Sequence, residues 1–263
     1  SIKSKPDSSI VQGIKLVKDG VADAFVSAGH TGAIMATSLL ILGRIEGLSR
    51  PALAAYIPTP TGGKILCDVG ANADARPEHM LQFAIMASTY FDHVEGKNKS
   101  KIALVNIGTE PSKGSELYQE THRLLREELP DDFIGNVEGR HLLDSKADIL
   151  VCDGFVGNTI LKFAESWVNL FIKQLNKQIM YKKYYQMTAM ILEPVFSNLK
   201  KIYDYEEFGG VPLLGVNGVI IVSHGTSTSK AVKNSLTAAQ KCVSENLLGD
   251  IQHGIKEHMV GTN

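Results

Sequence analysis

Five short polar turns carry the side chains of this 263-residue chain that could do chemistry. Each turn follows an apolar run and combines glycine with Asp, Asn, Ser, Thr or His. Glycine lets a backbone approach a ligand closely, and a helix that starts after the turn presents free N–H groups with partial positive charge. Several such turns together favour binding of an anion such as phosphate. The turns are Gly29-His30-Thr31-Gly32, Asp68-Val69-Gly70-Ala71-Asn72, Asn106-Ile107-Gly108-Thr109, Asp153-Gly154-Phe155-Val156-Gly157-Asn158 and Ser223-His224-Gly225-Thr226-Ser227.

The elements around these turns predict the frame that positions them. Apolar runs with β-forming residues precede the turns, and helical patterns follow most of them. Continuous apolar strands that alternate with helices indicate a doubly covered, mostly parallel sheet, whose turns gather along one carboxyl edge. The fold class is therefore α/β, and we expect a single domain over residues 1–263. The predicted strands are Ala24–Ala28, Lys64–Val69, Ile102–Ile107, Ile149–Cys152 and Val219–Ser223; the predicted helices are Ile10–Lys18, Glu78–Tyr90, Lys113–Glu128, Thr159–Lys173 and Thr228–Glu245.

Single residues in these turns leave alternatives open. His30 and His224 could donate to an oxyanion or phosphate or act as acid or base, and they could equally hold a neighbouring loop. Asp68 and Asp153 each end a strand and could bind Mg²⁺, but hydrogen bonding to turn amides is the favoured interpretation. No metal is therefore assigned.

Composition excludes several classes of protein. Lys and Arg number 27 and Asp and Glu 28, so no overall field points to nucleic acid. Cys67, Cys152 and Cys242 are far apart and two of them lie in apolar runs, which predicts buried free thiols. No apolar run approaches the roughly 18 residues that span a bilayer, and no signal peptide is visible, which predicts a soluble, cytoplasmic protein.

Familiar catalytic motifs are absent from the sequence. No G-x-G-x-x-G opens a helix and no G-x-S-x-G elbow is present. The stretch from Gly108 to Ser115 differs from a Walker A loop, because Lys113 precedes its glycine and Pro111 removes an N–H group. An activated nucleophile on the protein is thus not indicated.

The motifs as a set resemble the phosphate acyltransferases of bacterial phospholipid synthesis, the PlsX family. The matching segments span nearly the whole chain in the family's order. They are Asp23-Ala24-Phe25-Val26-Ser27-Ala28-Gly29-His30-Thr31-Gly32-Ala33, Asp68-Val69-Gly70-Ala71-Asn72-Ala73-Asp74, Asn106-Ile107-Gly108, Asn136-Val137-Glu138-Gly139-Arg140, Val151-Cys152-Asp153-Gly154-Phe155-Val156-Gly157-Asn158, Pro212-Leu213-Leu214-Gly215-Val216-Asn217-Gly218 and Ser223-His224-Gly225.

The resemblance implies a fold similar to phosphate acetyltransferases and to isocitrate and isopropylmalate dehydrogenases. It also implies transfer of a long acyl chain from acyl carrier protein to inorganic phosphate, without a cofactor. Two departures stand out. His30 occupies a position where the family usually has Asn, and the strand with which family chains usually begin is expected to be missing here.

On this basis we expect phosphate to be the nucleophile, held by turn amides and helix N-termini. The expected catalytic residues are His30, Asp68, Asn158 and His224. The expected substrate-binding residues are Ser27, Gly29, Thr31, Gly32, Gly70, Asn72, Asn106, Gly108, Lys113, Asp153, Gly154 and Gly157.

From Thr159 to about Tyr205 the regular alternation gives way to helical pattern with more apolar surface than one helix buries. We expect a helical hairpin inserted here, with a kink or new helix near Pro194. The hairpin could form a homodimer interface, and its basic, apolar tip could dock acidic acyl carrier protein or rest on an anionic membrane at the cytoplasmic face. The lysines concerned are Lys173, Lys177, Lys182 and Lys183.

Three other functions compete with this prediction. A coenzyme A-dependent phosphotransacetylase would share the fold. A metal-dependent 2-hydroxyacid dehydrogenase is disfavoured, because no adenosine-binding segment or acidic ligand cluster is recognisable. A non-catalytic scaffold that binds acyl carrier protein is the third.

Overall fold

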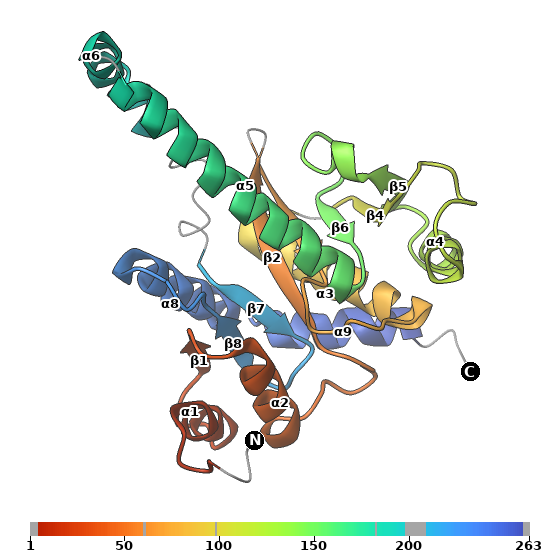
Figure 1. Cartoon of the computed structure of the whole chain (residues 1–263). Coiled ribbons are helices and arrows are strands. Elements are labelled where there is room, and N and C mark those ends of the chain that lie inside the picture. The colour runs from red at the N-terminus through yellow and green to blue at the C-terminus, as the bar shows by residue number, and fades with distance from the viewer. Residues whose placement is uncertain (1–4, 60–61, 98, 182, 198–208, 260–263) are drawn as a thin grey trace.

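The computed structural model describes residues 5–59, 62–97, 99–181, 183–197 and 209–259 (Figure 1). Its strands are β1 (Ala24–Ser27), β2 (Ala52–Thr59), β3 (Gly62–Cys67), β4 (Ile102–Asn106), β5 (Phe133–Glu138), β6 (Ile149–Val151), β7 (Val211–Leu214) and β8 (Val219–Val222). Its helices are α1 (Ser9–Lys18), α2 (Thr31–Ile41), α3 (Pro77–Glu95), α4 (Glu116–Glu128), the 3-10 turn η1 (Gly139–His141), α5 (Gly154–Tyr181), α6 (Lys183–Ile191), α8 (Ser229–Ser244) and α9 (Leu247–Met259).

The eight strands form one sheet in the order β1-β8-β7-β2-β3-β6-β4-β5. Four of the seven neighbouring pairs are parallel, which confirms a mostly parallel α/β sheet. The antiparallel pairs are β2–β3, β2–β7 and β7–β8. As a consequence β1 and β8 run opposite to β3, β6, β4 and β5.

This reversal corrects the expectation that all the turns share one carboxyl edge. The carboxyl ends of β1 and β8 point one way along the sheet and those of β3, β6 and β4 point the other way. The reason is that two antiparallel strands, β2 and β7, stand between the two parallel groups. Neither of these strands was predicted from the sequence.

Helices cover both faces of the sheet, as the continuous apolar strands require. One face packs against α3, α4, α8 and α9 through a core that includes Phe83, Phe91 and Ile255. The other face packs against α1, α2 and the first turns of α5, around Ile14, Ile34 and Leu66. Figure 1 shows α8 and α9 on the far side of the sheet from α5.

The five predicted strands are all present, each within about two residues of its expected bounds. Three strands were missed for identifiable reasons. β2 is rich in alanine, which is depleted from strands, and it ends near Pro58. β7 contains Pro212, and β5 contains Gly135 in its interior.

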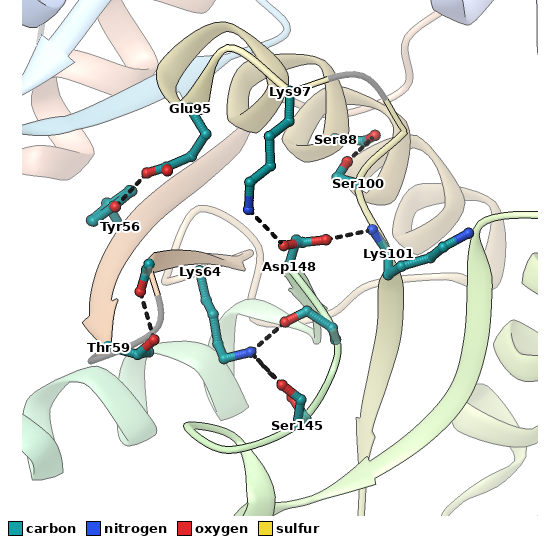
Figure 2. A network of polar contacts seen from close by, with 12 residues as sticks. Tyr56, Thr59, Lys64, Ser88, Glu95, Lys97, Ser100, Lys101, Ser145 and Asp148 are labelled. Atoms are coloured by element: carbon teal, nitrogen blue, oxygen red, sulfur yellow. Dashed lines mark hydrogen bonds and ion pairs between the residues drawn. The ribbon is translucent and has the colours of Figure 1, made fainter.

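A buried lysine fixes the loop before β6. The Lys64 ammonium, whose residue is 5% exposed, donates to the Ser145 carbonyl oxygen at 2.8 Å and also to that of Ala147 (Figure 2). Burial lowers the pKa of Lys64, whereas Asp148 and Asp144 act in the opposite direction. Asp148 in turn pairs with Lys97 at 3.5 Å. These contacts are structural, and Lys64 is not among the residues that line the candidate site described below.

The predicted helical excursion is present and starts earlier than expected, at Gly154 rather than Thr159. α5 has 28 residues and extends well beyond the sheet, with α6 at its outer end (Figure 1). Helical structure is interrupted at Leu192 and residues 193–197 are helical again, in agreement with the break expected near Pro194. Lys182 and the end of the expected excursion, residues 198–205, lie outside the described residues, and so does the side chain of Lys183.

The three cysteines are buried and free, as predicted. Burial raises the pKa of the Cys67 and Cys152 thiols, and it raises that of Cys242 to about 11. Among the described helices, none is long and apolar enough to cross a membrane.

Candidate functional site

A cavity of about 490 Å³ opens where the sheet splits between β2 and β7. These two strands pair only at Ala52–Leu214 and Leu53–Leu213. Beyond these pairs, Ala55 and Tyr56 on β2 line one side of the cavity, and Val211 at the start of β7 lines the other. The split thus brings the turns of both parallel strand groups to one space, although their strands run in opposite directions.

Two glycines form part of the β7 side of this cavity. A Cβ atom at Gly210 would approach the Val222 carbonyl oxygen to 2.6 Å, and one at Gly209 would approach that of Asn234 to 2.8 Å. Gly209 also has a positive φ of 81°. Only glycine fits this close packing without displacement of the backbone. Sequence reasoning did not single out this pair, although two adjacent glycines before an apolar run are a turn signal.

The turn after β1 places His30 at the cavity as the N-cap of α2. The Ala33 N–H donates to His30 Nδ1 at 3.3 Å. A neutral His30 therefore carries its proton on Nε2, which remains able to donate. The expectation of a polar anchor agrees with this cap, since an Asn side chain is itself a preferred N-cap and would accept the same bond. Gly29 and Thr31 also line the cavity, whereas Ser27 and Gly32 lie outside its lining.

The turn after β3 is built around Asp68, which is fully buried. Its carboxylate accepts from the backbone N–H groups of Leu53, Gly70, Ala71 and Asn72, and from the Asn72 side chain. Burial raises the pKa of Asp68, and these hydrogen bonds oppose the shift.

Five hydrogen bonds occupy the Asp68 oxygens, and Asp68 is not among the residues that line the cavity. This agrees with the favoured interpretation of Asp68 as an acceptor for turn amides, while a catalytic role for Asp68 stays a prediction. Asn72 is likewise engaged, because its side chain also donates to the Pro51 carbonyl oxygen at 2.7 Å. Gly70 remains as the cavity-lining residue of this turn.

The turn after β6 packs directly onto the Asp68 turn. A Cβ at Gly157 would come within 1.9 Å of the Asp68 carbonyl oxygen, and one at Gly154 within 2.6 Å of that of Asn72. The two glycines thus let the start of α5 sit against the backbone of the neighbouring turn. This contact points the exposed Asn158 into the cavity opposite Gly70, whose Cβ would be 3.5 Å from that of Asn158.

The turn after β8 contributes His224, Gly225 and Ser227 to the cavity. His224 Nδ1 lies 2.6 Å from the Thr226 hydroxyl and accepts from the Thr226 N–H at 3.3 Å. The ring is therefore held by its own turn with Nε2 left to face a ligand. Beneath it, the Ser223 and Ser235 hydroxyls are 2.9 Å apart, and Ser235 donates onward to the Ala231 carbonyl oxygen.

The turn after β4 does not line the cavity, although we expected Asn106, Gly108 and Lys113 to bind substrate. The Asn106 side chain forms hydrogen bonds within its own turn. It donates to the Lys113 carbonyl oxygen and accepts from the Ile107 N–H. The Lys113 ammonium is half exposed, 4.0 Å from Glu110. One link reaches the site, because the Tyr118 hydroxyl donates to Asp153 at 2.6 Å.

Asp153 itself holds the start of α5. Its other carboxylate oxygen accepts from the Val156 N–H at 2.9 Å, inside the first turn of the helix. The Tyr118 hydroxyl is retained in its protonated form by burial and by the adjacent Asp153, both of which raise its pKa. Asp153 is thus a positioning residue for the Asn158 turn, and the β4 turn adjoins the cavity without entering it.

A cation at the cavity comes from α5 itself. Lys162 pairs with Glu165 at 3.2 Å, and both residues line the cavity. Lys162 was not assigned to the site from the sequence. Its position one turn beyond Asn158 on the same helix is the signal that could have placed it. Within the ranges that the structure describes, no cluster of three or more His, Cys, Asp or Glu side chains could hold a metal ion.

The fold is found in other proteins of known structure. Three solved structures share it: a phosphotransacetylase from Streptococcus pyogenes (TM-score 0.57, 20% identity), the EutD phosphotransacetylase from Staphylococcus aureus (0.54, 19%) and a branched-chain phosphotransacylase from Enterococcus faecalis V583 (0.52, 17%). Each alignment covers 88% of this chain, and 66%, 67% and 77% of the respective structures.

The chain belongs to the family described as "Fatty acid synthesis protein", whose model matches residues 1–249. It is 48% identical over 261 residues to the phosphate acyltransferase of Heliobacterium modesticaldum. This alignment covers 99% of this chain and 76% of the relative. It is 47% identical over 253 residues to that of Desulfitobacterium hafniense DCB-2, with 96% and 75% covered. The resemblance to the phosphate acyltransferases is thereby confirmed.

Proposed function

We propose that this chain transfers an acyl group to inorganic phosphate, with a long-chain acyl thioester of acyl carrier protein as donor. Its relatives that are 47–48% identical are phosphate acyltransferases. The observation that carries the proposal is the convergence of four turns, with Gly29, Gly70, Asn158 and His224, on one cavity. Two of these turns lead directly into the N-termini of α2 and α5.

The chemistry requires no nucleophile on the protein. A phosphate oxygen attacks the thioester carbonyl carbon, and a C–O bond forms as negative charge moves to the carbonyl oxygen. Collapse of this intermediate breaks the C–S bond, and the carrier thiolate leaves and takes up a proton. The products are acyl phosphate and the free carrier thiol. What the protein must supply is alignment of the two substrates and hydrogen bonds to the oxyanion.

The described side chains divide between these tasks. His30 Nε2 and the Thr31 hydroxyl, at the N-terminus of α2, are suited to hold the phosphate, where the helix end adds partial positive charge. Asn158 and His224 face the same space and can donate to the carbonyl oxygen as it becomes charged. Lys162 offers a full positive charge at the rim. Lys113, on the adjoining turn, retains its proposed role in substrate binding.

The test is turnover of acyl carrier protein thioesters and coenzyme A thioesters with inorganic phosphate, followed as acyl phosphate formed. We expect activity with the carrier thioester, and a loss of at least tenfold for Asn158→Ala and for His30→Ala. His30→Asn should retain most activity, because Asn can supply the same N-cap bond. A preference for acetyl coenzyme A would instead identify a phosphotransacetylase. Absence of turnover with every donor would leave only a scaffold role.

The outer part of α5 supports two further proposals about partners. Its aromatic side chains are largely exposed, among them Phe163 at 68%, Trp167 at 59% and Phe171 at 61%. Exposed apolar surface of this extent marks an interaction site, and a second copy of the chain would bury it in a homodimer. Lys173 and Lys177 lie on the same stretch and are exposed, so the helix can also attract acidic carrier protein or anionic lipid. Such contacts would place the protein in the cytoplasm, peripheral at the membrane.

A further inference from the structure

We propose that the fatty tail of the acyl donor passes through the split in the sheet, past Tyr56, into a second cavity between α3 and α8 that sets the preferred chain length. This inference rests on the proposed function and adds to it the location of the tail. It follows from the position of Tyr56, which lines both cavities, and from the make-up of the second cavity.

The second cavity has a volume of about 210 Å³ and is formed largely by apolar groups. Tyr90 and Val94 of α3 form one side, and Ala238 and Cys242 of α8 form the other. A methylene group takes up roughly the 30 Å³ that a water molecule occupies in the liquid, so this space suits about seven methylene groups. The first cavity must also hold phosphate and the thioester, so a long chain needs the additional room.

Tyr56 stands at the boundary between the two spaces. On the neighbouring strand, a Cβ at Gly63 would lie within 1.8 Å of the Tyr56 ring, so the missing side chain makes room for the ring to lie flat over β3. The Tyr56 hydroxyl donates to Glu95 at 2.5 Å (Figure 2). Glu95 ends α3, so this bond ties the ring to the helix that forms the wall of the second cavity.

Gly209 forms the other part of the boundary. It lines the first cavity, and a Cβ on it would approach Ala238 of the second cavity to 3.2 Å. The partition at this point is therefore only one backbone thick. Leu53, Ala55 and Val211 line the first cavity together with Tyr56, so a chain that enters between β2 and β7 has apolar surface beside it. The polar turns thus lie at one end of the path and the apolar cavity at the other.

The test compares thioesters of acyl carrier protein with 8 and 16 carbons in the chain. Each methylene withdrawn from water contributes about fourfold to binding. Filling the second cavity with Ala238→Phe or Thr237→Trp should therefore lower kcat/KM for the 16-carbon donor at least tenfold, and for the 8-carbon donor less than threefold. Thr237 is exposed, so its variant tolerates the larger side chain. Leu236→Trp, on the same helix but outside the cavity, is the matched control and should leave both values unchanged.

A second measurement does not depend on turnover. Thr237→Cys introduces an accessible thiol at the second cavity, whereas the native cysteines are buried. Hexadecyl phosphate should slow maleimide labelling of this thiol at least fivefold, and octyl phosphate should not. The proposed tail path would be overturned if the filled variants lost kcat/KM equally for both donors. It would also be overturned if hexadecyl and octyl phosphate had the same effect on the labelling rate. Absence of turnover in the unmodified protein with either donor would refute the proposed function instead.

Discussion

The two ends of α5 obey different constraints. At its start, Gly154 and Gly157 are buried against the β3 turn and Asn158 faces the cavity. At its outer end, Phe171 is 61% exposed and Met180 is 67% exposed. Within the described residues, the first end is fixed by contacts inside the chain, whereas the second carries exposed apolar side chains. One helix thus joins the candidate site to the exposed surface that we propose to bind a partner.

The largest effect is expected at the packed end. Gly157→Ala places a Cβ within 1.9 Å of the Asp68 carbonyl oxygen, a backbone atom that cannot move aside without disturbing the whole turn. We expect the free energy of unfolding to fall by more than about 3 kcal/mol, with loss of turnover. Urea denaturation measures the first quantity.

The matched control for this change is Gly139→Ala, where a Cβ would meet no atom within 4 Å. Its effect on unfolding should stay within about 0.5 kcal/mol. If Gly157→Ala proved as mild as this control, the start of α5 would not be fixed by its packing, and the contrast between the two ends would fail.

An intermediate effect is expected at the outer end. Trp167→Ser combined with Phe171→Ser removes exposed apolar surface, so it should weaken self-association at least tenfold, about 1.4 kcal/mol, and leave the stability of the separated chain nearly unchanged. Sedimentation equilibrium over a range of concentrations measures the dimer dissociation constant.

Charge reversal on the same stretch separates the two proposed uses of this surface. Lys173→Glu with Lys177→Glu should leave self-association within about threefold and weaken binding of carrier protein or anionic vesicles in a salt-dependent way. A dimer that survives the loss of Trp167 and Phe171 would mean that this surface has another occupant.

The smallest effect probes the link between the packed end and the neighbouring turn. Tyr118→Phe removes the hydroxyl that donates to Asp153 and should cost about 1 kcal/mol near pH 7. The pKa of Tyr118 is raised in the folded chain, so its contribution is complete below about pH 10 and is lost as the pH rises towards the folded pKa. The difference between the two proteins should therefore stay constant from pH 8 to about pH 10 and shrink above it, as measured by urea denaturation. A difference that does not shrink on going from about pH 10 to about pH 11 would show that the hydroxyl bond does not stabilise the start of α5.

The sequence predicts the individual pieces of the site better than their arrangement. Apolar runs such as Ile149–Val151 and their glycine-containing turns are local features, and the structure has them close to where the pattern puts them. The reversal of β1 and β8 depends on β2 and β7, whose alanine and proline content hides them from strand rules. No local sequence pattern indicates that β2 and β7 pair at only two positions. The cavity between these strands therefore could not be predicted from the sequence.

Residue roles show the same division. The N-cap bond of His30 agrees with the prediction of a polar anchor, because capping depends on residues close in sequence. Asp68 was harder to assign, since Leu53 and Asn72 reach its carboxylate from two different segments. Lys113 stands on a turn that the pattern treats as equivalent to the others, yet the fold leaves that turn beside the cavity.

The Asp68 carboxylate also constrains how this chain can change over generations. It serves five donors at once, while Gly154 and Gly157 press against the backbone of the same turn. A single substitution at any of these three positions disturbs several contacts at once. We therefore expect few neutral substitutions at these positions. The proposed tail cavity leaves more room for change, because Thr237 in its wall is exposed.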